Sequence, residues 1–369
     1  MKKIKAGIIG AGSIGNHLAN SCRQLDWDVI VFDKDKNSLD RFRNTIYPSR
    51  YGKFDPQIKL VDVNFLQDYQ NEFDVLLIGT PPSSHLKLLK DAINLNPKLI
   101  MVEKPFVPPN LTILKEARQI IDDSSIPIYC GYNHRLSYVA RVFLEHLEVL
   151  PSNSKRKVVV NWLESWDGIL KAHPWLNGPE DSYLGYSNQG GGALFEHSHG
   201  VDLGVLTKML NRKCKEGILS SIVRFHDGKV FPESYDEKVS INFQFEDGDE
   251  VNVTQDVVTL PAVKTVNFYN EKFDAAMKFG IENMDSIEIV NKENPNRSLS
   301  LKFNKYRPSD FDLEIREINR ILKGEGQKFF ATAREALLIS FLSYVAFMSS
   351  VAKKKMKFNC ENLTYEEIS

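Results

Sequence analysis

The chain of 369 residues lacks several features that mark particular protein classes. It carries 47 basic and 48 acidic side chains, so no basic excess is available to attract nucleic acid. Its four cysteines are scattered and form no CxxC pair, which predicts reduced thiols rather than a disulfide framework or a zinc site. The N-terminal residues lack the apolar run and cleavage site of a signal peptide. These absences predict a cytoplasmic protein that binds neither nucleic acid nor metal.

One uncharged run, from Ala336 to Ala352, requires separate attention. It is short for a membrane span, it contains four serines, and three lysines follow it at Lys353–Lys355. The sequence shows no second hydrophobic span that would accompany it. We therefore expect a buried helix that closes a domain, and no membrane partner.

Length and composition suit two domains, since 42% of the residues are hydrophobic and one core seldom serves so long a chain. In the N-terminal part, short apolar runs alternate with helix-like stretches. We expect strands at Ile4–Ile9, Val29–Phe32, Val75–Ile78, Leu99–Val102 and Ile126–Cys130, and helices that include Ile14–Leu25, Ser84–Asn94 and Leu111–Asp122. This alternation predicts an α/β fold, with a doubly wound parallel sheet in a Rossmann domain of residues 1–133.

The pattern changes in residues 134–369. After a helix expected at Tyr138–Glu148, strand-like segments dominate up to about Phe303. The expected strands are Lys157–Trp166, Ile218–Phe225, Lys238–Phe245, Glu250–Val258, Lys264–Tyr269 and Ser286–Val290, with a hairpin turn at Asp247–Asp249. Helices at about Asp310–Leu322 and Thr332–Ala352 are expected to pack on this sheet. The second domain is thus predicted to be α+β, with a large, mostly antiparallel open sheet, for substrate binding and oligomerisation.

A glycine-rich segment lies between the first expected strand and the first expected helix. It reads Gly10-Ala11-Gly12-Ser13-Ile14-Gly15, which is the GxGxxG pattern in its required context. The first glycine makes a tight turn, the second lets a pyrophosphate approach the backbone, and the third lets the helix pack on the strand. The amides at the helix start, around Ser13 and Ile14, then face the phosphates. The segment predicts a dinucleotide site.

Asp33 ends the second expected strand and indicates which dinucleotide binds. A carboxylate at this place accepts hydrogen bonds from the adenosine ribose hydroxyls and repels a 2′-phosphate, which favours NAD. Lys34 and Lys36 lie beside it and leave NADP open, because a nearby cation accommodates the extra phosphate.

Four further segments, in order along the chain, resemble the motifs of one family. They are Gly79-Thr80-Pro81-Pro82 followed by His85, Glu103-Lys104-Pro105, Gly131-Tyr132-Asn133-His134-Arg135, and Gly190-Gly191-Gly192-Ala193-Leu194 followed by His199 and Asp202. They are similar to the nicotinamide-side segment, the EKP, the GxNxR and the GGG…HxxD of the glucose–fructose oxidoreductase / inositol dehydrogenase / rhizopine catabolism family (Gfo/Idh/MocA). With the expected sheets, the resemblance covers essentially the whole chain.

The resemblance implies a reversible, NAD(P)-dependent oxidation of a secondary alcohol on a sugar, a cyclitol or a nucleotide sugar. It implies cofactor contacts from Thr80, Pro81, His85, Glu103 and Lys104. Oxidising an alcohol requires a base for its proton and a cation for the developing alkoxide. Lys104 would polarise the substrate oxygen, and His199 would be the general base because imidazole titrates near neutrality.

The same resemblance implies a cis bond before Pro105 and a homodimer or homotetramer. This sequence departs from the commoner pattern GGGxLxDxGxHxxD, because it has Glu196-His197-Ser198-His199. The departure leaves open whether Glu196 orients His199, binds a substrate hydroxyl or does neither. Tyr183 or Tyr186 is a rival to His199 as the acid–base group.

The sequence leaves the roles of several other residues open. Asn133 and Arg135 would bind cofactor or substrate, or join the two domains, and Asp202 would make a structural hydrogen bond. Trp175 and Tyr183 stand in an irregular loop that would cover the substrate, or would fill the core. As whole-protein alternatives, a non-catalytic NAD(P)-bound sensor has the same fold, and a dihydrodiol or tetrapyrrole enzyme is a third option.

Overall fold

The computed structural model describes residues 3–148, 150, 154–171, 173–209, 215–229, 234–306, 308–326 and 328–368; one of the four cysteines, Cys214, lies outside them. Contacts within the chain define two compact units. The first comprises Met1–Val107, Glu116–Asn133 and Arg307–Ala336, and the second comprises Pro108–Lys115, His134–Tyr306 and Leu337–Ser369. The predicted division into functional domains of residues 1–133 and 134–369 stays a prediction.

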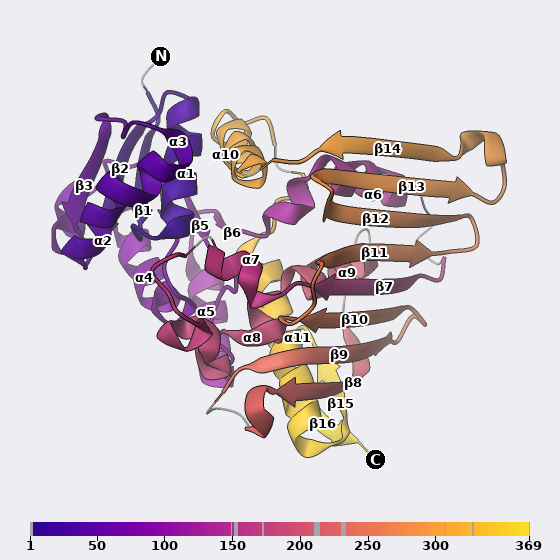
Figure 1. Ribbon diagram of the computed structural model, residues 1–369. Coiled ribbons are helices and arrows are strands. Elements are labelled where there is room, and N and C mark those ends of the chain that lie inside the picture. Colours follow the sequence, from indigo (N-terminus) through magenta and orange to yellow (C-terminus); the bar gives the residue numbers. More distant parts are fainter. Residues whose placement is uncertain are drawn as a thin grey trace. The chain divides into compact units, whose positions relative to one another are not determined.

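The first unit contains a six-stranded sheet in the order β3-β2-β1-β4-β5-β6 (Figure 1). Its strands are β1 Lys5–Ile9, β2 Asp28–Asp33, β3 Ile58–Asp62, β4 Val75–Ile78, β5 Leu99–Val102 and β6 Ile128–Cys130. Every neighbouring pair is parallel, which confirms the predicted doubly wound Rossmann sheet. Only β3 was not predicted, because this edge strand alternates Lys and Asp with apolar residues and is only partly buried.

The helices of the Rossmann part include one that the sequence placed elsewhere. They are α1 Ser13–Gln24, α2 Lys36–Arg41, η1 Phe42–Ile46, α3 Tyr47–Tyr51, η2 Val63–Tyr69, η3 Pro82–Ser84, α4 His85–Asn94 and α10 Ser309–Leu322, and α5 Leu111–Asp123 continues from the second unit into the first. The α10 helix packs on α1, where the Asp312 carboxylate accepts the Ser21 hydroxyl at 2.6 Å and Phe311 stacks on His17. The expectation that α10 packs on the second sheet was therefore wrong. An amphipathic pattern shows which face of a helix is buried, but not what covers it.

The second unit contains a ten-stranded sheet in the order β14-β13-β12-β11-β7-β10-β9-β8-β15-β16. Its strands are β7 Lys157–Leu163, β8 Glu216–Phe225, β9 Asp236–Phe245, β10 Glu250–Asp256, β11 Val263–Tyr269, β12 Phe273–Ile281, β13 Met284–Asn291, β14 Leu299–Asn304, β15 Lys355–Asn359 and β16 Thr364–Ile368. Its described pairs are antiparallel except β7 with β10, so the predicted sheet type is confirmed. The strands β12, β14, β15 and β16 were not predicted, because lysine, small or polar residues interrupt their apolar pattern.

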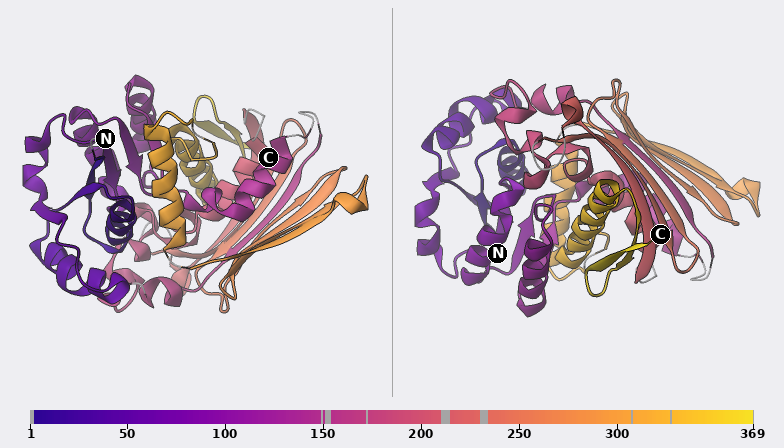
Figure 2. Two further views of the ribbon diagram at one scale, coloured as in Figure 1. Left: turned by 90° about the horizontal axis from the view of Figure 1, so that it is seen from above. Right: turned by 90° about the horizontal axis from the view of Figure 1, so that it is seen from below.

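Helices of the second unit lie against one face of this sheet (Figure 2). They are α6 Tyr138–Glu148, α8 Gly192–Phe195, α9 His199–Met209 and the part of α11 Ala333–Ala352 that follows Ala336; α7 Trp166–Lys171 follows β7. An 18-residue window of α11 has a mean hydropathy of 1.6, which makes α11 the one described helix that is apolar and long enough to cross a membrane. Within the structure, 67% of this window is buried. It matches the buried helix expected from the uncharged run.

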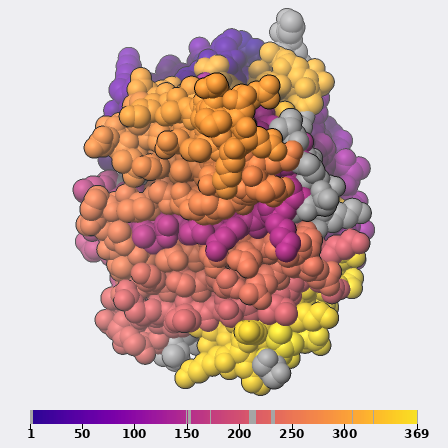
Figure 3. Space-filling model, turned by 90° about the vertical axis from the view of Figure 1, so that its right-hand side faces the viewer, coloured from indigo at the N-terminus to yellow at the C-terminus, as the bar shows by residue number. Residues whose placement is uncertain are grey.

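The other face of the sheet forms a broad surface, with β7 crossing its middle (Figure 3). It presents alternate residues of each strand, and many of these are polar. Asn242 on β9, for example, donates to Asn252 on β10 at 2.6 Å. The strands of this sheet also carry exposed apolar side chains, such as Ile222 on β8 and Tyr269 on β11.

Candidate active site

The glycine-rich loop joins β1 to α1, and its three glycines occupy different environments. A Cβ atom added at Gly10, where φ is +113°, would lie 2.7 Å from the carbonyl oxygen of Gly79. A Cβ at Gly15 would lie 1.9 Å from the Gly10 oxygen, so the helix approaches the strand too closely for any side chain. At Gly12 an added Cβ would meet no described atom within 4 Å. The open space over Gly12, at the start of α1, fits the pyrophosphate of a dinucleotide.

The Asp33 carboxylate lies at the carboxyl end of β2, beside this loop. One oxygen accepts the N–H of Ala11 at 2.7 Å, and the other accepts the N–H of Asp35 at 2.9 Å. The carboxylate is therefore fixed next to the glycine-rich loop, in the place where the Rossmann motif binds an adenosine ribose. Lys34 and Lys36 are both exposed.

Arg50 on α3 is a cofactor-side residue that the sequence did not identify. Its guanidinium donates to the Ser13 hydroxyl at 2.7 Å and to the Ser13 carbonyl at 2.9 Å. A cation thus lies beside the first turn of α1, where phosphates bind. No motif contains Arg50, so only the packing of α3 on α1 reveals it.

His85 connects the two loops that carry the nicotinamide-side residues. Its Nε2 lies 2.7 Å from the Thr80 carbonyl oxygen, and its Nδ1 lies 3.2 Å from those of Pro105 and Phe106. Burial lowers the pKa of His85, although the three carbonyls act in the opposite direction. Pro81 follows Thr80 directly, so His85 ties the segment Thr80–Pro81 to the one that follows Lys104.

The EKP segment follows β5. The Glu103 N–H donates to the Ile78 carbonyl on β4 at 2.9 Å, and the Glu103 carboxylate packs so closely that a Cβ at Gly131 would lie 2.8 Å from it. This contact explains the glycine in the GxNxR segment. Lys104 is half-buried, and its peptide bond to Pro105 is cis, as the resemblance implied. Asn133, the last residue of this part of the first unit, is buried.

In the second unit, three consecutive glycines precede the candidate acid–base residues. Gly190 and Gly192 have φ of +94° and +84°. A Cβ at Gly191 would lie 2.2 Å from the Tyr183 carbonyl oxygen, and one at Gly192 would lie 2.1 Å from a carboxylate oxygen of Asp236. Both the backbone conformation and the close approach of neighbours therefore require glycine here.

The turn after α8 carries the candidate acid–base groups. The His199 ring is 9% exposed and meets the His134 ring edge to face, with centroids 4.5 Å apart. The Tyr183 hydroxyl donates to Glu196 Oε2 at 2.9 Å, which brings together two of the predicted site residues. His134 belongs to the GxNxR segment but was not predicted as a site residue. His197 instead lies beside Trp166, with ring centroids 6.3 Å apart.

Arg135 and Asp202, from two of the family-like motifs, form a buried ion pair. The Arg135 Nε lies 2.9 Å from both carboxylate oxygens, and one terminal nitrogen lies 2.6 Å from Oδ1. The side chains are 2% and 0% exposed. The expectation that Asp202 makes a structural hydrogen bond thus has a specific partner, and the pair joins the GxNxR segment to helix α9.

The aromatic residues that precede the three glycines differ in burial. Trp162, on strand β7, is 1% exposed in the core. Trp175, in the irregular loop, is half-buried, and its ring meets the His173 ring edge to face with centroids 5.2 Å apart. Tyr186 is half-buried, and its N–H donates to the Tyr183 carbonyl. Among the described residues, no group of three or more His, Cys, Asp or Glu side chains is placed to hold a metal ion.

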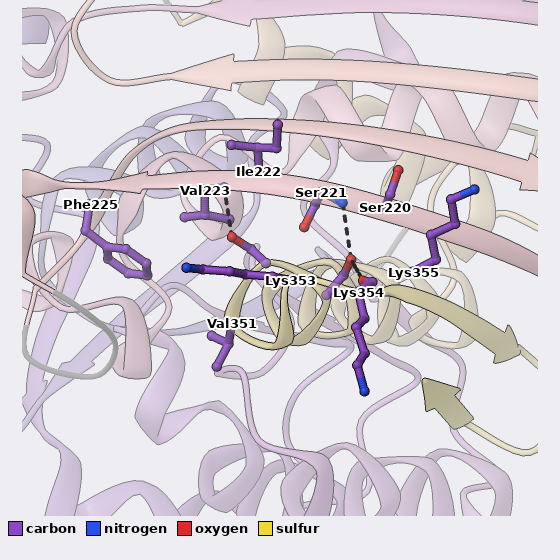
Figure 4. A pocket seen from close by; sticks show the side chains of 11 residues that line it. Ser220, Ser221, Ile222, Val223, Phe225, Val351, Lys353, Lys354 and Lys355 are labelled. Carbon is purple, nitrogen blue, oxygen red and sulfur yellow. Dashed lines mark hydrogen bonds between the residues drawn. The ribbon is translucent and has the colours of Figure 1, made fainter. Parts of the chain in front are cut away.

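A pocket of about 750 Å³ lies in the second unit between β8 and the end of α11 (Figure 4). There the hydroxyls of Ser349 and Ser350 accept the N–H groups of Ser221 and Val223 at 3.2 and 3.0 Å. Lys353, Lys354 and Lys355 also line it. None of the predicted site residues does.

Asp236 leads to a pH-dependent prediction about stability. Burial raises the pKa of its carboxyl from 3.8 to about 6, against hydrogen bonds that act in the opposite direction. The folded state thus binds the proton of this carboxyl more strongly than the unfolded state does. Proton binding therefore stabilises the folded state fully below about pH 4, and this stabilisation is lost as the pH rises through about 6. The unfolding free energy of the wild type minus that of Asp236→Asn should fall by about 3 kcal/mol over that range. Urea unfolding at successive pH values measures it, and a difference independent of pH would contradict the assignment.

Comparisons with known proteins agree with this fold. Residues 4–131 match the model of an oxidoreductase family with an NAD-binding Rossmann fold, GFO_IDH_MocA. No curated protein sequence matches the chain.

Solved structures match nearly the full length at low identity. Levoglucosan dehydrogenase in complex with NADH and L-sorbose is 14% identical with a TM-score of 0.73, covering 97% of this chain and 99% of that chain. UDP-N-acetylglucosamine 3-dehydrogenase GnnA from Acidithiobacillus ferrooxidans is 12% identical, with a TM-score of 0.69 and coverage of 95% and 99%. The WlbA dehydrogenase from Bordetella pertussis, in complex with NADH and UDP-GlcNAcA, is 15% identical, with a TM-score of 0.68 and coverage of 96% and 98%.

At these identities the solved structures establish the fold, while the family match adds the NAD-binding oxidoreductase class. Residues 4–131 therefore form an NAD-binding Rossmann domain of the kind found in the Gfo/Idh/MocA oxidoreductases.

Proposed function

We propose that this protein is an NAD-dependent dehydrogenase of a secondary alcohol on a sugar, a nucleotide sugar or a cyclitol. One observation carries the proposal. In the second unit, side chains that exchange protons with hydroxyl groups gather on the turn after α8 and beside it. There the Tyr183 hydroxyl donates to Glu196, and the His199 ring contacts the His134 ring. A hydroxyl-rich substrate matches these polar groups. The solved relatives with bound sugar-like molecules or nucleotide sugars are consistent with it.

In the proposed reaction, the residues of this chain supply binding, charge and proton transfer. When bound, NAD supplies the acceptor for the hydride that leaves the alcohol carbon. Lys104 places its ammonium at the alcohol oxygen and stabilises the negative charge that develops there. His199 takes the hydroxyl proton, so the products are a ketone, a reduced cofactor and a protonated imidazole. Tyr183 and Glu196, which are bonded to each other, together bind a substrate hydroxyl. Trp175, Asn133 and Lys104 are further substrate contacts.

The test combines purified protein with NAD or NADP and a panel of inositols, free sugars and UDP-sugars, followed by absorbance of the reduced cofactor. Turnover with one class identifies the substrate. Tight cofactor binding without turnover of any member would instead indicate the non-catalytic sensor. The same proposal places the protein in the cytoplasm as a homodimer or homotetramer, and sedimentation of the purified protein tests the oligomeric state.

Replacement of Asp33 by asparagine is expected to shift cofactor preference toward NADP. Asparagine keeps an oxygen for the Ala11 N–H but removes the charge that repels a 2′-phosphate, so the ratio of NADPH to NADH dissociation constants should fall by roughly tenfold. Fluorescence titration of both reduced cofactors measures this ratio. Asp62, which ends the neighbouring strand β3 and is exposed, provides the matched control Asp62→Asn. An unchanged ratio in Asp33→Asn would refute the role of this carboxylate.

A further inference from the structure

The turn between α8 and α9 carries Glu196 and His199, and the strand ladders of the sheet do not reach it. Two side chains of the sheet bond the helices on either side of it instead: Asp236 from β9 and Gln255 from β10. Both are 0% exposed. No motif of the sequence includes either residue.

Asp236 holds the start of the turn. Its Oδ2 accepts the N–H of Leu194 at 2.7 Å, and its Oδ1 accepts the Ser187 hydroxyl at 2.8 Å. Leu194 is in the first turn of α8, where an N–H has no partner within the helix. The carboxylate therefore caps α8 from a strand 42 residues away in sequence.

A bulge in β9 gives Asp236 this direction. The pairing of β8 with β9 shifts register, with Arg224 opposite Lys238 but Phe225 opposite Asp236. The extra residue, Glu237, moves Asp236 from the open face of the sheet to the helix-covered face. Gly192 completes the fit, since any Cβ there would collide with the carboxylate.

Gln255 holds the end of the turn. Its amide nitrogen donates to the carbonyls of Ala193 and Leu194 at 2.7 and 3.3 Å, and its oxygen accepts the N–H of Val201 at 2.9 Å. One side chain therefore bridges the last residues of α8 and the first turn of α9. A Cβ at Gly200 would lie 2.6 Å from the Gln255 oxygen, so any side chain there would displace the Gln255 amide.

We propose that Asp236 and Gln255 are positioning residues that fix the orientation of Glu196 and His199. The two side chains bond the backbone of both helices that flank the turn, so neither helix can shift without breaking a buried hydrogen bond. The part of this inference that concerns catalysis rests on the proposed function; the part that concerns the geometry of the turn does not. A displacement of about 1 Å in such groups lowers rates by roughly 10²-fold.

The first arm of the test reads the geometry and needs no substrate. Histidine labelled with ¹³C in its ring gives one Hε1–Cε1 correlation for each of the eight histidines, and His199→Gln identifies the signal of His199. Its position reports on the edge-to-face contact with His134. In Asp236→Ala and Gln255→Met this signal should move, and in Asp236→Asn it should move less, while the signal of His146 on α6 stays in place. Gln244→Met, an exposed glutamine on β9, is the matched control and should change nothing.

The second arm uses the substrate found with the panel. The same two variants should lower kcat by roughly 10- to 100-fold and change KM little, with Asp236→Asn between them and the wild type. An unmoved His199 signal in both variants overturns the proposal. A moved signal with unchanged kcat overturns the role in catalysis. If no substrate is found, the proposed function fails, and the His199 signal alone still decides whether these side chains hold the turn.

Discussion

Replacing Lys104 by alanine is expected to lower kcat/KM for the substrate by about 10²- to 10³-fold and to leave NADH binding within a few-fold of the wild type. The ammonium acts on charge that appears only as the alcohol loses its proton, so its loss raises the barrier more than it weakens binding. Lys104 is positioned for this role because it follows β5 at the carboxyl edge of the Rossmann sheet, where such sheets bind their ligands.

The measurement is steady-state kinetics with the identified substrate, together with fluorescence titration of NADH. Lys87→Ala is the matched control, since Lys87 lies on α4 of the same unit, is 79% exposed and pairs with Asp91 within its helix. It removes the same charge and should change neither value. An activity of Lys104→Ala close to that of the wild type would show that another group polarises the oxygen.

Breaking the pair of Arg135 and Asp202 is expected to lower the unfolding free energy by about 3–5 kcal/mol for either Arg135→Met or Asp202→Leu. Each substitution leaves the opposite charge in a buried site without its ionic partner. The double variant Arg135→Met/Asp202→Leu should lose less than the sum of the two singles, because it leaves neither charge behind.

Urea unfolding followed by tryptophan fluorescence reports on this pair, since Trp162, Trp166 and Trp175 all belong to the second unit. Lys354 and Glu367 provide an exposed pair in the same unit, at 2.6 Å and with side chains 55% and 50% exposed. Lys354→Met should cost less than about 1 kcal/mol. If Arg135→Met cost as little as Lys354→Met, or if the double variant lost the full sum, the pair would not act as a buried unit.

The features predicted well from the sequence are those that depend on neighbours along the chain. GxGxxG between a strand and a helix marked the cofactor loop, and the structure shows why each glycine stands there. The helix predicted at Tyr138–Glu148 has those same bounds in the structure, because its apolar face repeats with the helical period. The strand β12 escaped prediction because two alanines and Gly280 weaken the alternating pattern.

Placement of elements was predicted less well. The α10 helix was correctly expected as a helix, but its partner α1 was not foreseen. The sequence of α10 has an apolar face that also carries acidic residues, and such a face can pack on more than one surface. Which surface it packs on depends on the buried polar face of α1, which lies nearly three hundred residues earlier in the chain.

Periodicity and glycine spacing act over short distances, so the amino-acid sequence alone predicts a Rossmann domain for NAD and a second domain with an open sheet. The folded chain was needed to show that Arg135 pairs with Asp202 and that Tyr183 bonds Glu196. It was also needed to show that Asp236 and Gln255 bond the helices on either side of the turn before His199. The direction of Asp236 depends on one extra residue in β9, and strand register is set by pairing between distant segments. Such contacts have no local pattern in the chain, so they become visible only when the sheet is assembled.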